Sequence, residues 1–203
     1  MLFRKGPTFK PVNHREDKTL ISGVNQVLEF SLCDVLLCTD SEKILDLKSE
    51  NLKKLKYLII PIHPHIGCIP RRNYSYKDVI KHIEKDFTGK LIPFNLRSVL
   101  WNGGKQSKDI NGFGGHINKN FIDLKTVLSA GNSIVDFVTL LNNIKKVELY
   151  GIGILENTKR HNTIFKNTVN VVSRETIGKR TLISIRNQVI GSLKKKNIEF
   201  KFN

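Results

Sequence analysis

The chain has 203 residues, 39% of them hydrophobic, and its 34 lysines and arginines outnumber 18 aspartates and glutamates, giving a formal net charge of +16. This length allows one sizeable hydrophobic core, so we expect a single domain. No run of about 18 apolar residues occurs, which argues against a membrane-spanning helix. No long apolar segment follows Arg4 and Lys5, so we expect no secretory signal.

The positive charge favours a polyanionic partner, which is nucleic acid, an anionic membrane surface, or a phosphorylated or acidic substrate. The three cysteines, Cys33, Cys38 and Cys68, follow no disulfide-framework spacing and indicate reduced thiols. We therefore expect a cytoplasmic protein. The charge also suits a peripheral position at the inner membrane surface.

Apolar runs predict the strands. The segments CDVLLCT (33–39) and YLIIPI (57–62) are continuously apolar, as in strands buried on both faces. The last run, 198–202, alternates and is expected at a sheet edge. The full set of expected strands is 1–3, 20–24, 33–39, 57–62, 91–94, 147–150 and 198–202.

Helical spacing of apolar residues alternates with these strands. The expected helices cover a short turn after Asn25, a helix from Glu42 to Leu52, and the ranges 76–86, 133–143 and 173–195. The glycine-rich segment 102–115 is expected to be a mobile loop. Such alternation predicts the α/β class: one Rossmann-like domain over residues 1–203, with a mostly parallel sheet and helices on both faces.

Three turn-forming segments each follow a predicted strand. Lys5-Gly6-Pro7-Thr8 follows the first, Gly23-Val24-Asn25-Gln26 the second, and Tyr150-Gly151-Ile152-Gly153 a late one. Parallel strands end at one edge of their sheet, where a nucleotide can contact all three segments. A fourth segment, Ser129-Ala130-Gly131-Asn132, begins a buried helix and adds unpaired N–H groups there.

These segments, in this order, resemble the motifs of bacterial lipooligosaccharide-type sialyltransferases and related Rossmann-like glycosyltransferases. That family has a Gly-X-Gly-Pro-Ser-Leu loop, then a small residue followed closely by Asn, a Ser-Gly motif and a Gly-Ile-Asp strand end. The matching residues here are Arg4-Lys5-Gly6-Pro7-Thr8-Phe9, Gly23-Val24-Asn25, Ser129-Ala130-Gly131 and Gly151-Ile152-Gly153. Arg4 replaces the first glycine, and Gly153 replaces the aspartate.

The resemblance implies a site and a reaction. Gly6, Pro7 and Thr8 would line phosphate and ribose, and Asn25 would hydrogen-bond the nucleotide. Gly131 and Asn132 would approach the base, with Gly151 at the same edge. The implied activity transfers a sugar from a nucleotide-activated donor, CMP-linked in that family, to a hydroxyl of an anionic glycan acceptor. No metal or other cofactor is expected.

The family's histidine base has no counterpart at the corresponding place, which reads Arg186-Asn187-Gln188. His161 is the first candidate base, because neighbouring cations would keep it neutral. Lys159 or Arg160 would then stabilise the leaving phosphate. His116 is the second, on a loop able to act as a lid. A solvated basic loop explains His161 equally well.

Other readings stay open. Asp40 suits either a ribose or acceptor contact or a helix cap. His63, His65 and Cys68 have the residue types but not the completed spacing of a zinc site. The segment 71–76 pairs arginines with tyrosines, which together with the net charge makes a nucleic-acid-binding protein the main alternative. A catalytically degenerate nucleotide-binding relative is the other.

Overall fold

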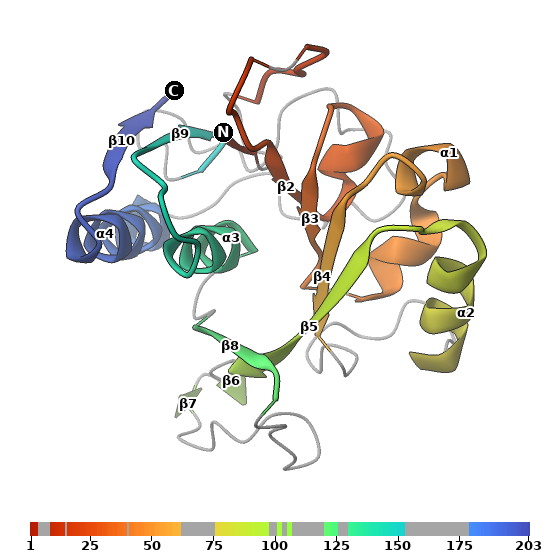
Figure 1. The fold of residues 1–203 in the computed structure, drawn as a ribbon. Helices are drawn as coiled ribbons and strands as arrows, with labels where there is room; N and C mark the ends of the chain where they lie inside the picture. The colour runs from red at the N-terminus through yellow and green to blue at the C-terminus, as the bar shows by residue number, and fades with distance from the viewer. Residues whose placement is uncertain are drawn as a thin grey trace.

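The computed structural model describes residues 1–3, 9–14, 16–39, 41–61, 76–97, 101–102, 105–106, 120–125, 130–152 and 179–203. Its centre is an eight-stranded sheet of order β10-β9-β1-β2-β3-β4-β5-β8 (Figure 1). The strands are β1 (Leu2–Phe3), β2 (Ser22–Val24), β3 (Val35–Leu37), β4 (Tyr57–Pro61), β5 (Lys90–Arg97), β8 (Ile122–Lys125), β9 (Lys146–Tyr150) and β10 (Glu199–Phe202). Every neighbouring pair is parallel.

One face of the sheet is covered by α3 (Ala130–Thr139) and α4 (Lys179–Lys195), seen at the left of Figure 1. The other face packs against two 3₁₀-helices, η1 (Asn25–Glu29) and η2 (Ser41–Asp46), and against α1 (Ser49–Leu52) and α2 (Tyr76–Asp86). Two hydrophobic cores therefore lie on opposite sides of one sheet. The expected α/β class, with a parallel sheet and helices on both faces, is confirmed.

Strand alternation explains why the central runs are continuously apolar. Val35 and Leu37 of β3 face the α3–α4 layer, whereas Leu36 and the following Cys38 face the opposite layer. All four side chains are buried. Because each side chain of such a strand enters a core, no position can be polar without a specific partner.

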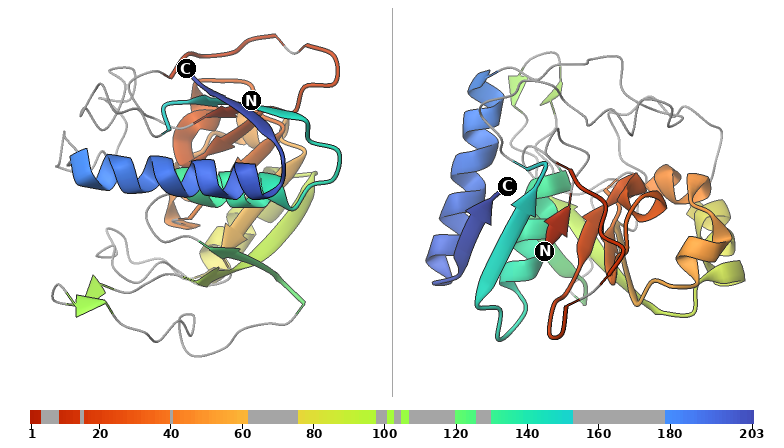
Figure 2. Two further views of the ribbon diagram at one scale, coloured as in Figure 1. Left: turned by 90° about the vertical axis from the view of Figure 1, so that its left-hand side faces the viewer. Right: turned by 90° about the horizontal axis from the view of Figure 1, so that it is seen from above.

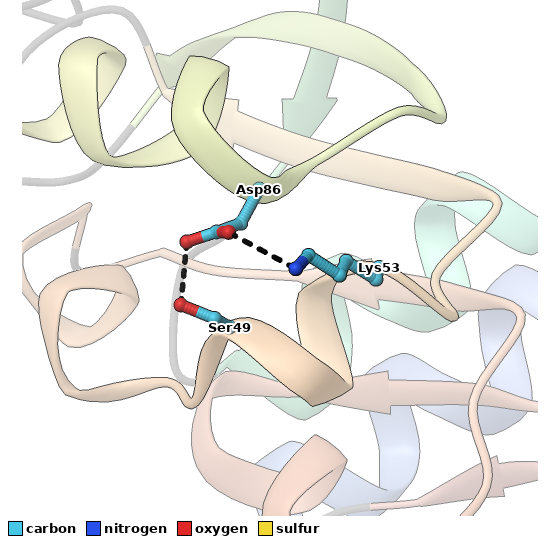
Figure 3. Close-up of polar contacts among 3 residues, drawn as sticks. All are labelled: Ser49, Lys53 and Asp86. Carbon is cyan, nitrogen blue, oxygen red and sulfur yellow. Dashed lines mark hydrogen bonds and ion pairs between the residues drawn. The ribbon is translucent and has the colours of Figure 1, made fainter.

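The helix expected from Glu42 is instead the 3₁₀-helix η2 followed by the short helix α1. Asp86, the last residue of α2, fastens α1: its carboxylate accepts a hydrogen bond from Ser49 Oγ and pairs with Lys53 Nζ at 3.6 Å (Figure 3). The Ser49 hydrogen bond, together with the charges of Lys53 and Lys85, lowers the pKa of Asp86. These contacts connect α1 to α2 at the end where β4 and β5 begin.

A small antiparallel pair, β6 (Trp101–Asn102) and β7 (Lys105–Gln106), overlaps the start of segment 102–115, which is expected to be a mobile loop. Residues 107–119 lie outside the described part of the chain. Among the described helices, none has both the length and the apolar content needed to cross a bilayer.

The parallel strands define two edges of the sheet. We call the edge where the strands begin the amino edge, and the edge where they end the carboxyl edge. Since α2, α3 and α4 each precede a strand of the sheet, they run back from the carboxyl edge and end at the amino edge (Figure 2). The candidate site lies at the carboxyl edge.

Candidate functional site

The chain reverses its direction of travel across the sheet between β1 and β9. From β1 the strands progress one way through β2, β3, β4, β5 and β8, and the chain then returns through α3 to place β9 on the other side of β1. Phe3, the last residue of β1, pairs with Tyr150, the last residue of β9. In open parallel sheets, ligands bind at the carboxyl ends of the strands where such a reversal occurs.

Asn25 lies one strand away from this reversal, directly after β2. Its φ of 51° is in the left-handed region, which asparagine tolerates better than most residues. Its Oδ1 atom is buried and accepts no hydrogen bond from any residue that the structure describes. A buried acceptor without a donor is costly, and strained backbone of this kind concentrates at ligand sites. The hydrogen-bonding capacity of this oxygen is therefore unused within the described part of the chain.

Gly23, one residue before the end of β2, makes close packing beneath Asn25 possible. A Cβ atom at this position would lie 2.8 Å from Cys33 Sγ and 2.9 Å from Val27 Cγ1. Val27, in η1, is fully buried. The absent side chain lets η1 turn tightly after β2 and hold Asn25 at the edge.

Gly151 follows β9 at the reversal itself. Its φ of 70° is left-handed, which glycine adopts without steric cost, and both Gly151 and Ile152 are buried. The preceding Tyr150 donates its hydroxyl to Glu148 Oε2 at 3.0 Å. Burial and this hydrogen bond raise the pKa of Tyr150, and the same bond lowers the pKa of Glu148. The phenol thus stays protonated and is held against its own strand.

Gly131 and Asn132 lie in the first turn of α3, and both are buried. The Nδ2 atom of Asn132 donates to Gln188 Oε1 at 3.0 Å and to the carbonyl of Ile185 at 3.4 Å, both on α4. The amide nitrogen therefore joins the two helices. The two residues are 56 positions apart, so the sequence gives no local sign of this hydrogen bond. The expected approach of Asn132 to the base of a nucleotide stays a prediction.

The remaining expected site residues lie outside the described part of the chain. These are Gly6, Pro7 and Thr8, which follow β1 in the sequence, the candidate bases His116 and His161, and also Asp40, Lys159 and Arg160. Their roles stay predictions. The residues His63, His65 and Cys68 lie outside it as well, and the described residues include no group of three or more potential metal ligands.

Two cavities lined by described residues lie away from these groups. The larger, of about 490 Å³, is lined by residues at the beginnings of β1, β2 and β9, including Ser22, Lys145 and Lys146. The smaller, of about 330 Å³, lies beside η1 and the residues before β3. Neither is the expected nucleotide site, because neither includes Asn25 or Gly151.

Comparison with known proteins gives no match to any family model, curated protein or solved structure.

Proposed function

We propose that this chain is a Rossmann-like domain with sialyltransferase-like glycosyltransferase activity, acting in the cytoplasm. It would transfer a sugar from a nucleotide-activated donor, CMP-linked, to a hydroxyl of a glycan acceptor. The observation that carries the proposal is Asn25, which has a left-handed backbone directly after β2, the strand next to the β1–β9 reversal, and a buried Oδ1 that accepts no hydrogen bond from a described residue.

The chemistry of a nucleotide suits this edge. Ribose hydroxyls and exocyclic base amines can donate hydrogen bonds to Oδ1 of Asn25. The segment Lys5–Thr8 follows β1 and would contact the phosphate with backbone N–H groups. Gly151 follows the neighbouring strand β9, where a Cβ-free backbone permits close approach.

The proposed reaction is a direct displacement at the anomeric carbon of the donor sugar. A histidine, His161 or His116, would remove the proton of the acceptor hydroxyl as the new glycosidic bond forms. The nucleotide leaves with the electron pair of the broken bond, and Lys159 or Arg160 would stabilise its phosphate. The proposal requires no metal or other cofactor.

The test is thermal unfolding of the purified protein with cytidine, uridine, guanosine and adenosine monophosphates. A nucleotide at about 100 times its Kd stabilises the folded state by about 2.7 kcal/mol, a rise in Tm on the order of 5–10 °C for this size. We expect selective stabilisation, with CMP the largest. Asn25→Gly should reduce it, because glycine keeps the left-handed backbone but removes Oδ1.

Asn143→Gly is the matched control, since Asn143 also has left-handed backbone, with φ 66°, but is exposed at the amino edge. The role of Asn25 would be refuted if both variants lost the same amount of stabilisation by CMP, or if Asn25→Gly bound CMP with unchanged affinity. A short DNA duplex is tested in the same assay. If only the duplex raises Tm, and if this rise falls steeply with salt concentration, the result would favour the nucleic-acid alternative suggested by the net charge. Nucleotide binding without glycosyl transfer would indicate the degenerate relative.

A further inference from the structure

The two helices on one face end together at the amino edge. Asn132 of α3 binds Gln188 of α4, and one turn later Ser192 Oγ donates to Asp136 Oδ1 at 3.1 Å. Both pairs are separated by 56 residues, so the helices run side by side in one direction, as the left view of Figure 2 shows. Leu140 directly follows α3 and Lys196 directly follows α4, so both lie at this edge.

Five exposed lysines lie at this edge of the sheet. Lys194 and Lys195 are the last residues of α4, Lys196 follows them, Lys145 precedes β9, and Lys146 is its first residue. The N–H of Glu199 donates to the carbonyl of Lys145 at 3.0 Å, which joins the two segments. We call Leu140 and these five lysines the basic corner.

The charges of the basic corner are only partly neutralised. Lys146 pairs with Glu148 at 3.4 Å, Glu199 lies beside Lys146 on the neighbouring strand, and Glu16 lines the same cavity as Lys145 and Lys146. The other four lysines form no ion pair with any described residue. The dipole of α4 favours Lys194 and Lys195 in its last turn. It does not account for Lys145 and Lys146, which belong to another element.

Leu140 is the unusual member of the corner. It directly follows α3 and is 52% exposed, the largest exposed fraction among the three large hydrophobic residues exposed in the described part of the chain. An exposed aliphatic side chain at the same edge of the sheet as these lysines matches the boundary of an anionic bilayer. There the leucine enters the acyl region while lysine ammonium groups contact lipid phosphates.

We propose that the basic corner docks this protein on an anionic membrane surface. Nucleic acid fits less well, because the corner has neither an arginine fork for phosphate or base edges nor an aromatic ring for stacking. Leu140 would also have no partner on a phosphate backbone. Docking through the amino edge leaves the carboxyl edge open to the aqueous phase, so the proposal is independent of the nucleotide site.

The experiment is co-sedimentation of the full chain with phosphatidylcholine vesicles, with and without phosphatidylglycerol, beside titration with a short DNA duplex. We expect binding only to the anionic vesicles. Changing Lys194, Lys195 and Lys196 together to Gln should weaken it by about 100-fold. Leu140→Ser should weaken vesicle binding by about tenfold without changing the response to DNA.

The matched control changes the exposed Lys10, Lys48 and Lys81 to Gln, which removes the same net charge away from the corner. An equal loss in this control would show that overall charge, not the corner, directs binding. No binding to anionic vesicles, tighter binding to the duplex, or no effect of Leu140→Ser would each overturn the proposal. Lys145→Gln provides a second variant if the triple variant fails to fold.

Discussion

Asp34 offers a direct test of how the sheet is held together. It is almost completely buried at the start of β3, and its Oδ2 accepts the backbone N–H of Ile21 at 3.0 Å. Its Oδ1 pairs with Lys56 Nζ at 3.2 Å, and its backbone carbonyl accepts the N–H groups of Lys56 and Tyr57. One residue therefore joins the beginnings of β2, β3 and β4.

Replacing Asp34 with alanine should destabilise the fold by about 3 kcal/mol. A hydrogen bond to a charged acceptor contributes about 1.5–3 kcal/mol, and its loss leaves the N–H of the fully buried Ile21 without an acceptor. The Lys56 pair adds at most about 1 kcal/mol, because the lysine side chain is 56% exposed. Asp34→Asn keeps an acceptor oxygen and should cost about 1 kcal/mol.

Urea unfolding followed by circular dichroism measures these differences, since about 3 kcal/mol is a large part of a typical stability of about 5–15 kcal/mol. Lys56→Ala is the control and should cost less than about 1 kcal/mol. The reasoning fails if Lys56→Ala is as damaging as Asp34→Ala, because the exposed ion pair would then carry the effect. It also fails if Asp34→Asn and Asp34→Ala are equally unstable.

Two further predictions concern glycine and cysteine positions. Gly191→Ala should raise the free energy of unfolding by about 0.5–1 kcal/mol, because Gly191 lies inside α4 with no atom within 4 Å of an added Cβ. Gly89→Ala should lower the free energy of unfolding in the same urea assay, since its Cβ would lie 2.4 Å from the carbonyl oxygen of Lys56. Equal effects of the two glycine substitutions would contradict both predictions. Burial and the charge of Asp34 raise the pKa of Cys33 to about 12, so its thiol is neutral at pH 8. Mass-resolved alkylation at pH 8 should be far slower for Cys33 in the folded protein than in urea, and equal rates would refute this.

Much of the secondary structure could be predicted because its signals are local. The spacing of Val79, Ile80 and Ile83 predicts a helix over 76–86, and α2 has these bounds. The apolar run 57–62 predicts a strand buried on both faces, and Leu58, Ile59 and Ile60 of β4 are fully buried. The alternating last strand lies at the sheet edge, as expected.

The sequence is less informative where partners are distant along the chain. The helix expected over 133–143 instead begins at Ala130 and ends at Thr139, and its hydrogen bond to α4 joins Asn132 to Gln188, 56 residues away. The position of Asp34 inside an otherwise apolar run gives no indication of its partner, which is 13 residues away at Ile21. Asn25 was identified from motif order, whereas its left-handed backbone and unpaired oxygen became visible only in three dimensions.

The two edges of the sheet separate the basic corner from the candidate site. β9 runs from Lys146 at the amino edge to Tyr150 at the carboxyl edge, four steps that span about 13 Å at 3.3 Å per residue. This exceeds the Debye length of about 8 Å at physiological ionic strength, so the lysines of the basic corner contribute little attraction at the nucleotide edge. Affinity for a phosphate there must come from groups at the carboxyl edge itself, which is why the Asn25→Gly comparison, rather than a change in net charge, tests the proposed activity.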